Sequence, residues 1–472
     1  MRFAIDSTER PRFLAIARAI RRAIDAGRLV PGAPLPSTRE LAAQQGVHRH
    51  TVAAAYAELE ADGTLIAEEK RCFRVNPLLA QPPSQPRPTR GVPRPIALTP
   101  ARIVTPDRWF DDDRPLTFDF RSGIADVRSF PLRELKSHMW DALRAGPRLL
   151  GYGAPAGHPR LLKGLTDYLA RMRAVQDKGI IITHGSQEGI LLTALLMVRP
   201  GDNVAVEGLG YRPTWEALRL AGAHLVPIAV DEHGLDTEHL SRVMARKRIK
   251  LIVTTPLHQY PTTVTMPLPR RRELMALAER HGAALLEDDY DHEFHYRSEP
   301  PPPLASDDPA DLVFYVSSFS KVLLPTVRLG FMAVPRAMTQ HVAAMRRVTT
   351  RQNDQITQDA LARWLEAGGL ERHLRRMRRQ NAERLGVVDT TLTKLREKHT
   401  RLKWRVPDGG TALWLDLGRD SAHAAKEALE RRVGVDPETM FRFDGAVGRN
   451  LRLGFAKLTP TEITTGLGRL LG

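Results

Sequence analysis

Apolar residues near the N-terminus recur at helical spacing, in segments separated by turn residues. The first segment places four of them on one face of a helix: Phe13, Ile16, Ile20 and Ile24. Gly27 supplies a stop after this helix. Residues 37–40, Ser-Thr-Arg-Glu, have the capping-box spacing that begins a second helix, which we expect to end near Gly46.

A third helix follows the turn at Gly46-Val47. Its apolar face carries Val52, Tyr56 and Leu59, and its N-terminal end carries four polar residues: His48, Arg49, His50 and Thr51. This arrangement is typical of a helix-turn-helix, in which the start of the second helix meets DNA bases and phosphates. Residues 65–66 and 72–75, on either side of the charged run 68–71, predict a two-stranded wing.

Farther along the chain, strand-like apolar runs alternate with longer helical segments. We expect six strands there, at residues 180–183, 203–207, 224–228, 251–255, 284–287 and 312–316. Such alternation predicts an α/β fold with a largely parallel sheet covered by helices. Helices dominate from about Pro335, and residues 411–417 and 451–455 return as strands, which indicates a smaller C-terminal subdomain.

A proline-rich segment separates these two regions, with ten prolines between Pro77 and Pro115. Proline lacks a backbone N–H and disfavours helices and central strands, so we expect an extended spacer of about 3.1 Å per residue. The sequence therefore predicts a winged helix-turn-helix domain over 1–76, a linker over 77–115 and a large domain over 116–472.

Composition narrows the class of protein. A net charge of +16 over 472 residues favours a polyanionic partner, and with a helix-turn-helix that partner is double-stranded DNA. Basic runs also occur in the large domain, so we expect that domain to add to DNA affinity. The single cysteine, Cys72, excludes a disulfide framework and a cysteine-rich zinc site, and we expect no metal. Without a signal peptide or an apolar run near 20 residues, we expect a cytoplasmic protein with no membrane partner.

The most informative polar cluster is residues 317–321, Ser-Ser-Phe-Ser-Lys, followed by Arg328. Pyridoxal 5'-phosphate requires an amine for its aldehyde, hydroxyls and a cation for its phosphate, and an acid for its ring nitrogen. Lys321 offers the amine, while Ser318 or Ser320 with Arg328 offers the phosphate contacts. The acid comes from the run 287–290, Glu-Asp-Asp-Tyr, at the end of an apolar strand, where open α/β sheets bind ligands.

Three further segments suit the same site. Ser186 and Gln187 begin an apolar helix after a strand, where backbone amides and the helix dipole favour phosphate. Tyr211 follows the next strand and offers an aromatic lid. Arg452 is a cation inside an apolar strand, so it needs an anionic partner, either a ligand's acid or an internal Asp or Glu.

Residues 35–42, the Gly46-Val47 turn and Thr51-Val52 with Tyr56 resemble the winged-helix domain of GntR regulators, over about residues 11–76. The resemblance implies that DNA contacts come from the second helix and the start of the third: Arg39, His48, Arg49, His50 and Thr51. The family's wing usually carries glycines near its tip. This chain has Glu-Glu-Lys-Arg at 68–71 instead, which leaves contact between the wing and DNA open.

The large domain resembles fold-type I aminotransferases and, with the winged helix in front, the MocR (GabR-like) branch of GntR regulators. The similar segments are 118–123, 129–131, 151–153, 258–262, 287–291 and 407–410. The resemblance implies that Lys321 holds pyridoxal 5'-phosphate as an internal aldimine, Asp288 pairs with the ring nitrogen and Tyr290 hydrogen-bonds the ring hydroxyl. It further implies a stacking residue, Tyr211, four phosphate ligands, Ser186, Gln187, Ser318 and Arg328, and Arg452 for the effector's acid. Leu209 and Thr263 depart from the branch's usual proline and glycine.

These features predict a DNA-binding transcription regulator that senses a small amino compound through aldimine exchange, and the resemblance implies a homodimer. A true aminotransferase with an accessory N-terminal domain is the main alternative, because every catalytic residue type is present. A third hypothesis is a conventional ligand-binding repressor with a degenerate pocket, against which Lys321, Asp288 and Arg328 argue. The sequence names neither the effector nor the operator.

Overall fold

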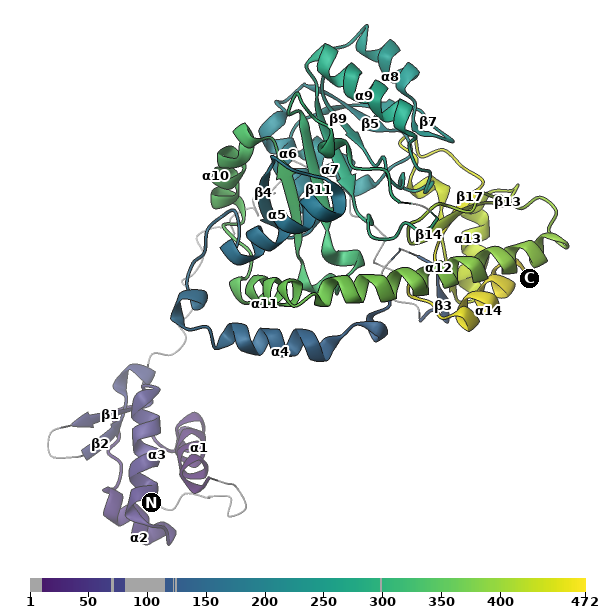
Figure 1. The fold of residues 1–472 in the computed structure, drawn as a ribbon. Helices are drawn as coiled ribbons and strands as arrows, with labels where there is room; N and C mark the ends of the chain where they lie inside the picture. The colour runs from purple at the N-terminus through teal and green to yellow at the C-terminus, as the bar shows by residue number, and fades with distance from the viewer. Residues whose placement is uncertain (1–10, 69–71, 81–114, 122, 124, 298) are drawn as a thin grey trace, which may run out of the picture. The chain divides into compact units, whose positions relative to one another are not determined.

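The structure is a computed structural model that describes residues 11–68, 72–80, 115–121, 123, 125–297 and 299–472 (Figure 1). The chain divides into two compact units, residues 1–100 and 101–472. The point of division falls within the segment 77–115 that was predicted as a linker. Most of that segment, residues 81–114, lies outside the described residues, and Pro77–Ala80 forms a short 3-10 turn.

The N-terminal unit is a helix-turn-helix followed by a hairpin, as predicted. Its elements are α1 (Arg12–Asp25), α2 (Thr38–Gln45), α3 (Arg49–Ala61), β1 (Leu65–Glu68) and β2 (Cys72–Val75). The Ser37 hydroxyl accepts from the Glu40 amide and the Glu40 carboxylate accepts from the Ser37 amide, which is the predicted capping box. Gly46 ends α2 with φ of 63°, where a side chain would be strained. Residues 69–71 of the predicted wing lie outside the described residues.

A seven-stranded sheet forms the centre of the large unit, in the order β4-β12-β11-β10-β9-β5-β6. The strands are β4 (Gly179–Thr183), β5 (Asn203–Glu207), β6 (His224–Ile228), β9 (Ile249–Thr254), β10 (Ala284–Asp289), β11 (Val313–Ser318) and β12 (Gly330–Val334). The six predicted strands are confirmed. The prediction missed β12, which runs antiparallel to both neighbours and has five buried residues without polar alternation.

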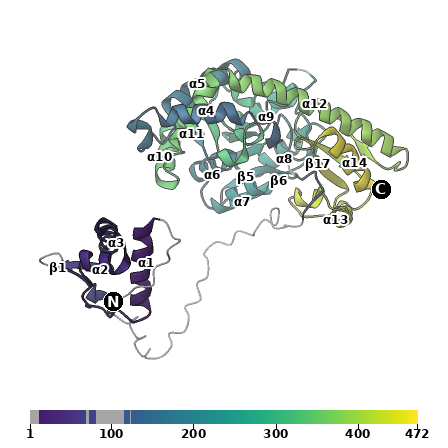
Figure 2. The same cartoon turned by 90° about the horizontal axis from the view of Figure 1, so that it is seen from below.

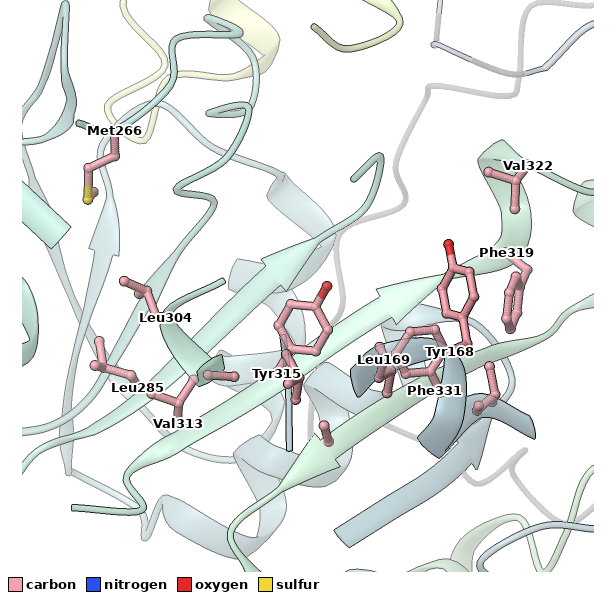
Figure 3. Close-up of a cluster of buried hydrophobic side chains, with 14 of the residues drawn as sticks. Tyr168, Leu169, Met266, Leu285, Leu304, Val313, Tyr315, Phe319, Val322 and Phe331 are labelled. Atoms are coloured by element: carbon pink, nitrogen blue, oxygen red, sulfur yellow. The ribbon is translucent and has the colours of Figure 1, made fainter. Parts of the chain in front are cut away.

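Helices cover both faces of this sheet (Figures 1 and 2). One face packs against α6 (Ser186–Met197), α7 (Arg212–Leu220) and α10 (Thr339–Thr349). The other packs against α5 (Pro159–Arg173), α8 (Thr237–Met244), α9 (Leu268–His281) and α11 (Gln355–Glu366). Figure 3 shows part of the second core, where Tyr168 of α5 lies near Phe331 of β12. Successive residues of each strand point alternately into the two cores, so neighbouring residues at the end of a strand face opposite sides of the sheet.

The predicted smaller subdomain is present at the C-terminal end. Its sheet has the order β13-β14-β17-β16, with β13 (Lys403–Trp404), β14 (Ala412–Asp416), β17 (Asn450–Gly454) and β16 (Asp436–Pro437). The long helix α12 (Gly369–Arg396), α13 (Ser421–Glu430) and α14 (Pro460–Leu471) share one apolar core with this sheet. Among the helices within the described ranges, none is both long and apolar enough to cross a membrane.

Candidate functional site

Lys321 lies where β11 ends, in a 3-10 turn formed by Phe319–Lys321. The Ser318 hydroxyl begins this turn by accepting from the Ser320 amide at 3.0 Å. Strands β10 and β11 are parallel neighbours with Asp288 beside Val316, so Asp288 and Lys321 emerge at the same edge of the sheet. Burial and the nearby charge of Arg452 lower the pKa of Lys321 to about 8, although acidic neighbours oppose them.

The three acidic residues at the end of β10 point to different faces of the sheet, because side chains alternate along a strand. Glu287 accepts from the amides of Leu304 and Ala305, and Asp289 accepts from the Tyr315 hydroxyl at 2.6 Å. Both belong to the face opposite Asp288, whose Oδ1 is buried and has no hydrogen-bond partner. Burial and the neighbouring carboxylates raise the pKa of Asp288 to about 7, so an adjacent cation would relieve an electrostatic cost.

The start of α6 lies beside Arg328 and the end of β11. Gly185 precedes the helix with φ of 81°, and a Cβ there would lie 3.4 Å from the Arg328 guanidinium. Arg328 donates to the His184 carbonyl at 2.9 Å, and Ser318 pairs across the sheet with Gly330, which pairs with Thr183. A hydroxyl, a guanidinium and the free amides of a helix start therefore gather at one place, which suits a phosphate dianion.

Three tyrosine side chains pack against one another near Asp288 and Arg452. The Tyr260 ring makes edge-to-face contacts with Tyr211 at 5.4 Å and with Tyr290 at 5.7 Å between ring centroids. Tyr290 donates its hydroxyl hydrogen to the His258 carbonyl at 3.0 Å, which leaves the hydroxyl oxygen able to accept. Sequence reasoning did not select Tyr260 as a site residue, although it lies in the segment 258–262 that carried the resemblance.

Arg452 of β17 lies over Tyr260, with its guanidinium carbon 4.7 Å from the ring centroid. Its side chain is buried, and Nε and Nη1 have no hydrogen-bond partner. Burial lowers the pKa of Arg452, but the nearby tyrosines and acids outweigh burial and raise the pKa above its ordinary value. Arg452 therefore presents a permanent charge with two unsatisfied donors, and an acid is the group that satisfies them best.

The unsatisfied groups give a direct test of fit for pyridoxal 5'-phosphate. A buried carboxylate oxygen on Asp288 suits a protonated ring nitrogen, and the amine of Lys321 suits an aldehyde. Gln187 donates one amide hydrogen to the Pro213 carbonyl at 2.9 Å, and the second N–H of the same amide can serve a phosphate oxygen. The residues present therefore fit this cofactor. Arg452 has no role in holding the cofactor and is available to bind a second molecule that carries an acidic group.

In the N-terminal unit, the five predicted DNA contacts lie at the starts of two helices that pack together, Arg39 on α2 and the others at the start of α3. Arg39, His48, Arg49 and His50 are exposed and Thr51 is half-buried, while Val52, Tyr56 and Leu59 point into the core. Three local contacts order these residues: His48 Nδ1 accepts from the His50 amide, their rings stack at 5.2 Å, and Arg49 donates to the Thr38 hydroxyl. The helix start thus presents hydrogen-bonding groups outward, as a recognition helix does.

Two family models match the chain. Residues 13–75 match "Bacterial regulatory proteins, gntR family", and residues 120–470 match "Aminotransferase class I and II". A probable rhizopine catabolism regulatory protein MocR from Rhizobium meliloti is 31% identical, covering 89% of this chain and 90% of that protein. The HTH-type transcriptional regulator TauR from Rhodobacter capsulatus is 30% identical, covering 94% and 92%.

Solved aminotransferases share the fold of the large unit. LysN, an α-aminoadipate aminotransferase from Thermus thermophilus complexed with N-(5'-phosphopyridoxyl)-L-leucine, has a TM-score of 0.69 and 26% identity, covering 75% of this chain and 90% of LysN. Both halves of the resemblance seen in the sequence are thus confirmed. The chain belongs to the MocR-type GntR regulators, transcription regulators that join a DNA-binding helix-turn-helix to an aminotransferase-like domain with pyridoxal 5'-phosphate as cofactor.

Proposed function

We propose that the large unit senses a small compound that carries both an amine and an acidic group, and that this binding changes the affinity of the winged helix for DNA. The observation that carries the proposal is the pair of unsatisfied buried groups near Lys321: the Asp288 carboxylate oxygen and the Arg452 guanidinium. Asp288 needs a cation and Arg452 needs an anion, so the site is matched to a cofactor and an acidic ligand together.

Each predicted residue has a role in this proposal. When bound, the cofactor supplies an aldehyde that combines with amines. Lys321 holds the cofactor, Asp288 pairs with its ring nitrogen, Tyr290 accepts from its ring hydroxyl, and Tyr211 covers the ring. The phosphate ligands are Ser186, Gln187, Ser318 and Arg328. Arg452 binds the effector's acid.

The effector's amine competes with the Lys321 amine, and its acid is held by Arg452 on the small subdomain. Arg452 lies on β17, whereas Asp288 lies on the central sheet and Lys321 in the turn that follows β11, so one ligand would contact both parts. A ligand shifts a conformational equilibrium only by its difference in affinity for the two states. A coupling of about 1 to 3 kcal/mol would suffice to regulate DNA binding.

We also infer that the chain forms a homodimer through α4 (Leu132–Leu143). Four large apolar side chains are exposed along one face of this helix: Leu132, Met139, Trp140 and Leu143. Leu135 and Ala142 of the same helix are buried, and α4 packs against α11 (Figure 1). Monomers rarely expose contiguous apolar surface of this kind, and a second copy would cover it.

Borohydride reduction of the holoprotein followed by peptide mapping tests the cofactor assignment. The proposal expects the reduced cofactor on Lys321, and its appearance on another lysine would contradict the assignment. A screen of amino compounds, read by visible absorption and by DNA mobility shift, tests the sensing step. The aminotransferase alternative is supported instead if an amino compound is converted to its keto acid over many turnovers without any change in DNA affinity.

A further inference from the structure

Asp291 is a buried acid beside the cofactor site to which the proposed function gives no role. It follows Tyr290 directly, and only 1% of its surface is exposed. Its Oδ1 lies 2.7 Å from His258 Nδ1, while its Oδ2 is buried and has no hydrogen-bond partner. A buried carboxylate with one oxygen satisfied is costly unless a positive charge lies near the other.

His258 links Asp291 to a second histidine. His258 Nε2 lies 3.2 Å from His295 Nδ1, and the two rings stack with an interplanar angle of 12°. A Cβ at Gly409 would lie 2.4 Å from His258 Nε2, so the backbone closes directly on the imidazole and fixes its place. Burial and the neighbouring His258 lower the pKa of His295 to about 4, so His295 is neutral at neutral pH.

This arrangement keeps a hydrogen on Nδ1 of His258 in either protonation state. A neutral His258 with that tautomer donates to Asp291 and accepts from His295, whereas a protonated His258 donates to both. In each case Asp291 retains its hydrogen bond, and the two histidines hold its carboxylate in one orientation.

Asp291 acts on the site residues through its charge. It favours the protonated form of Lys321 against the opposing effects of burial and of Arg452. It also stabilises the charge on Arg452 and raises the pKa of Asp288 and of Tyr290. Tyr290, directly before Asp291, contacts the Tyr260 ring over which Arg452 lies, so the chain brings the Asp291 carboxylate close to this site. Its negative charge opposes the repulsion between Lys321 and Arg452.

We propose that Asp291 is the counter-ion of the Lys321 nitrogen, held in position by His258 and His295. The inference rests on the proposed function, because it concerns Lys321 when it carries the cofactor. Asp291 is a positioning and electrostatic residue: it favours a positive charge on that nitrogen, the form in which the attached carbon is most open to an incoming amine.

Other charged groups also act on Lys321 and His295, and the choice of control variant takes them into account. Asp288, Asp436 and Arg452 act on Lys321 along with Asp291, and Asp408, His292 and Arg378 act on His295. Asp408 has a partly exposed side chain and acts on His295, whereas the acids that act most strongly on Lys321 are Asp291, Asp288 and Asp436. Asp408→Asn therefore provides a matched loss of one negative charge outside that set.

The test is a pH titration of the holoprotein's visible absorption, which reports protonation of the nitrogen that joins Lys321 to the cofactor. Asp291→Asn should lower the pKa of this transition by about 1 or more, since an opposite charge at short range shifts a pKa by about 1 to 3. His258→Leu should lower it similarly, because an unsupported buried carboxylate takes up a proton. His258→Gln keeps an N–H donor and should restore most of the parent pKa, and the control Asp408→Asn should leave it unchanged.

A transition whose pKa is the same in the parent, Asp291→Asn and His258→Leu would overturn the inference, as would an equal shift in Asp408→Asn. If one of the two test variants does not fold, the other carries the same comparison. Peptide mapping after borohydride separates the two proposals. Cofactor on Lys321 with an unchanged titration refutes only the counter-ion, whereas cofactor on another lysine refutes the proposed function itself.

Discussion

Replacing Arg452 with methionine removes the charge that we assign to the effector's acid while keeping most of the apolar side-chain volume. Arg452 has two buried donors without partners, Nε and Nη1. Hydrogen bonds to charged groups contribute about 1.5 to 3 kcal/mol each, so two of them amount to about 3 kcal/mol or more. We therefore expect Arg452→Met to weaken an acidic amino effector on the order of 100-fold in dissociation constant.

The assay compares two ligands on the same variant, an amino acid and the amine that remains after its carboxylate is removed. Both should alter the visible absorption of the holoprotein, because both carry the amine. Only the amino acid should lose affinity in Arg452→Met, and Arg452→Lys should retain part of it because the charge remains. Equal losses for the amino acid and the amine would refute the assignment of Arg452 to the acid.

Three further outcomes follow from the structure. Arg49→Ala should cost about 1 to 3 kcal/mol of sequence-specific DNA binding if Arg49 contacts a base. If Arg49 contacts phosphate instead, the slope of DNA affinity against salt concentration should fall by about 1. Unchanged mobility shifts for both Arg49→Ala and Arg39→Ala would exclude these residues as DNA contacts. In the cofactor-free protein the pKa of Asp288 is raised to about 7, so its contribution to stability is present below about pH 4 and is lost as the pH rises to 7. Asp288→Asn should reduce this pH dependence of the free energy of unfolding, measured with urea. The same pH dependence in the parent and the variant would contradict the prediction. Trp140→Glu should shift the protein toward monomer in sedimentation, unlike the control Ser137→Glu on the same helix, and a persistent dimer would argue against α4 as the interface.

Local signals in the sequence were sufficient for much of the architecture. The capping box at Ser37 and Glu40 specifies a helix start through contacts only three residues apart, and the structure has it as predicted. The six parallel strands follow from apolar runs of ordinary strand length. Strand β12 escaped prediction because Gly330–Val334 follows a motif that reads as loop chemistry and has no alternation to mark it.

Relations between distant segments were harder to predict. Alternation along β10 settles that Asp288, rather than Glu287 or Asp289, faces the site of Lys321, and this requires knowing which core covers which face. The same holds for Tyr260. It contacts Tyr211 and Tyr290 because the loops that carry them meet at one edge of the central sheet, and it contacts Arg452 because β17 of the small subdomain lies beside that edge. No local pattern in the sequence predicts that His258 is the partner of Asp291, because the two residues are 33 positions apart along the chain.

The central claim, that occupation of the Lys321 site by an amino compound changes DNA affinity, is tested most directly by one comparison. The dissociation constant for operator DNA is measured with and without effector, for the parent protein and for Lys321→Ala. We expect the parent's affinity to change by about 5- to 150-fold, which corresponds to 1 to 3 kcal/mol of coupling. Lys321→Ala should bind DNA as the effector-free parent does, because the winged helix is a separate compact unit, and it should lose the effector response. A response of equal size in both proteins would contradict the account.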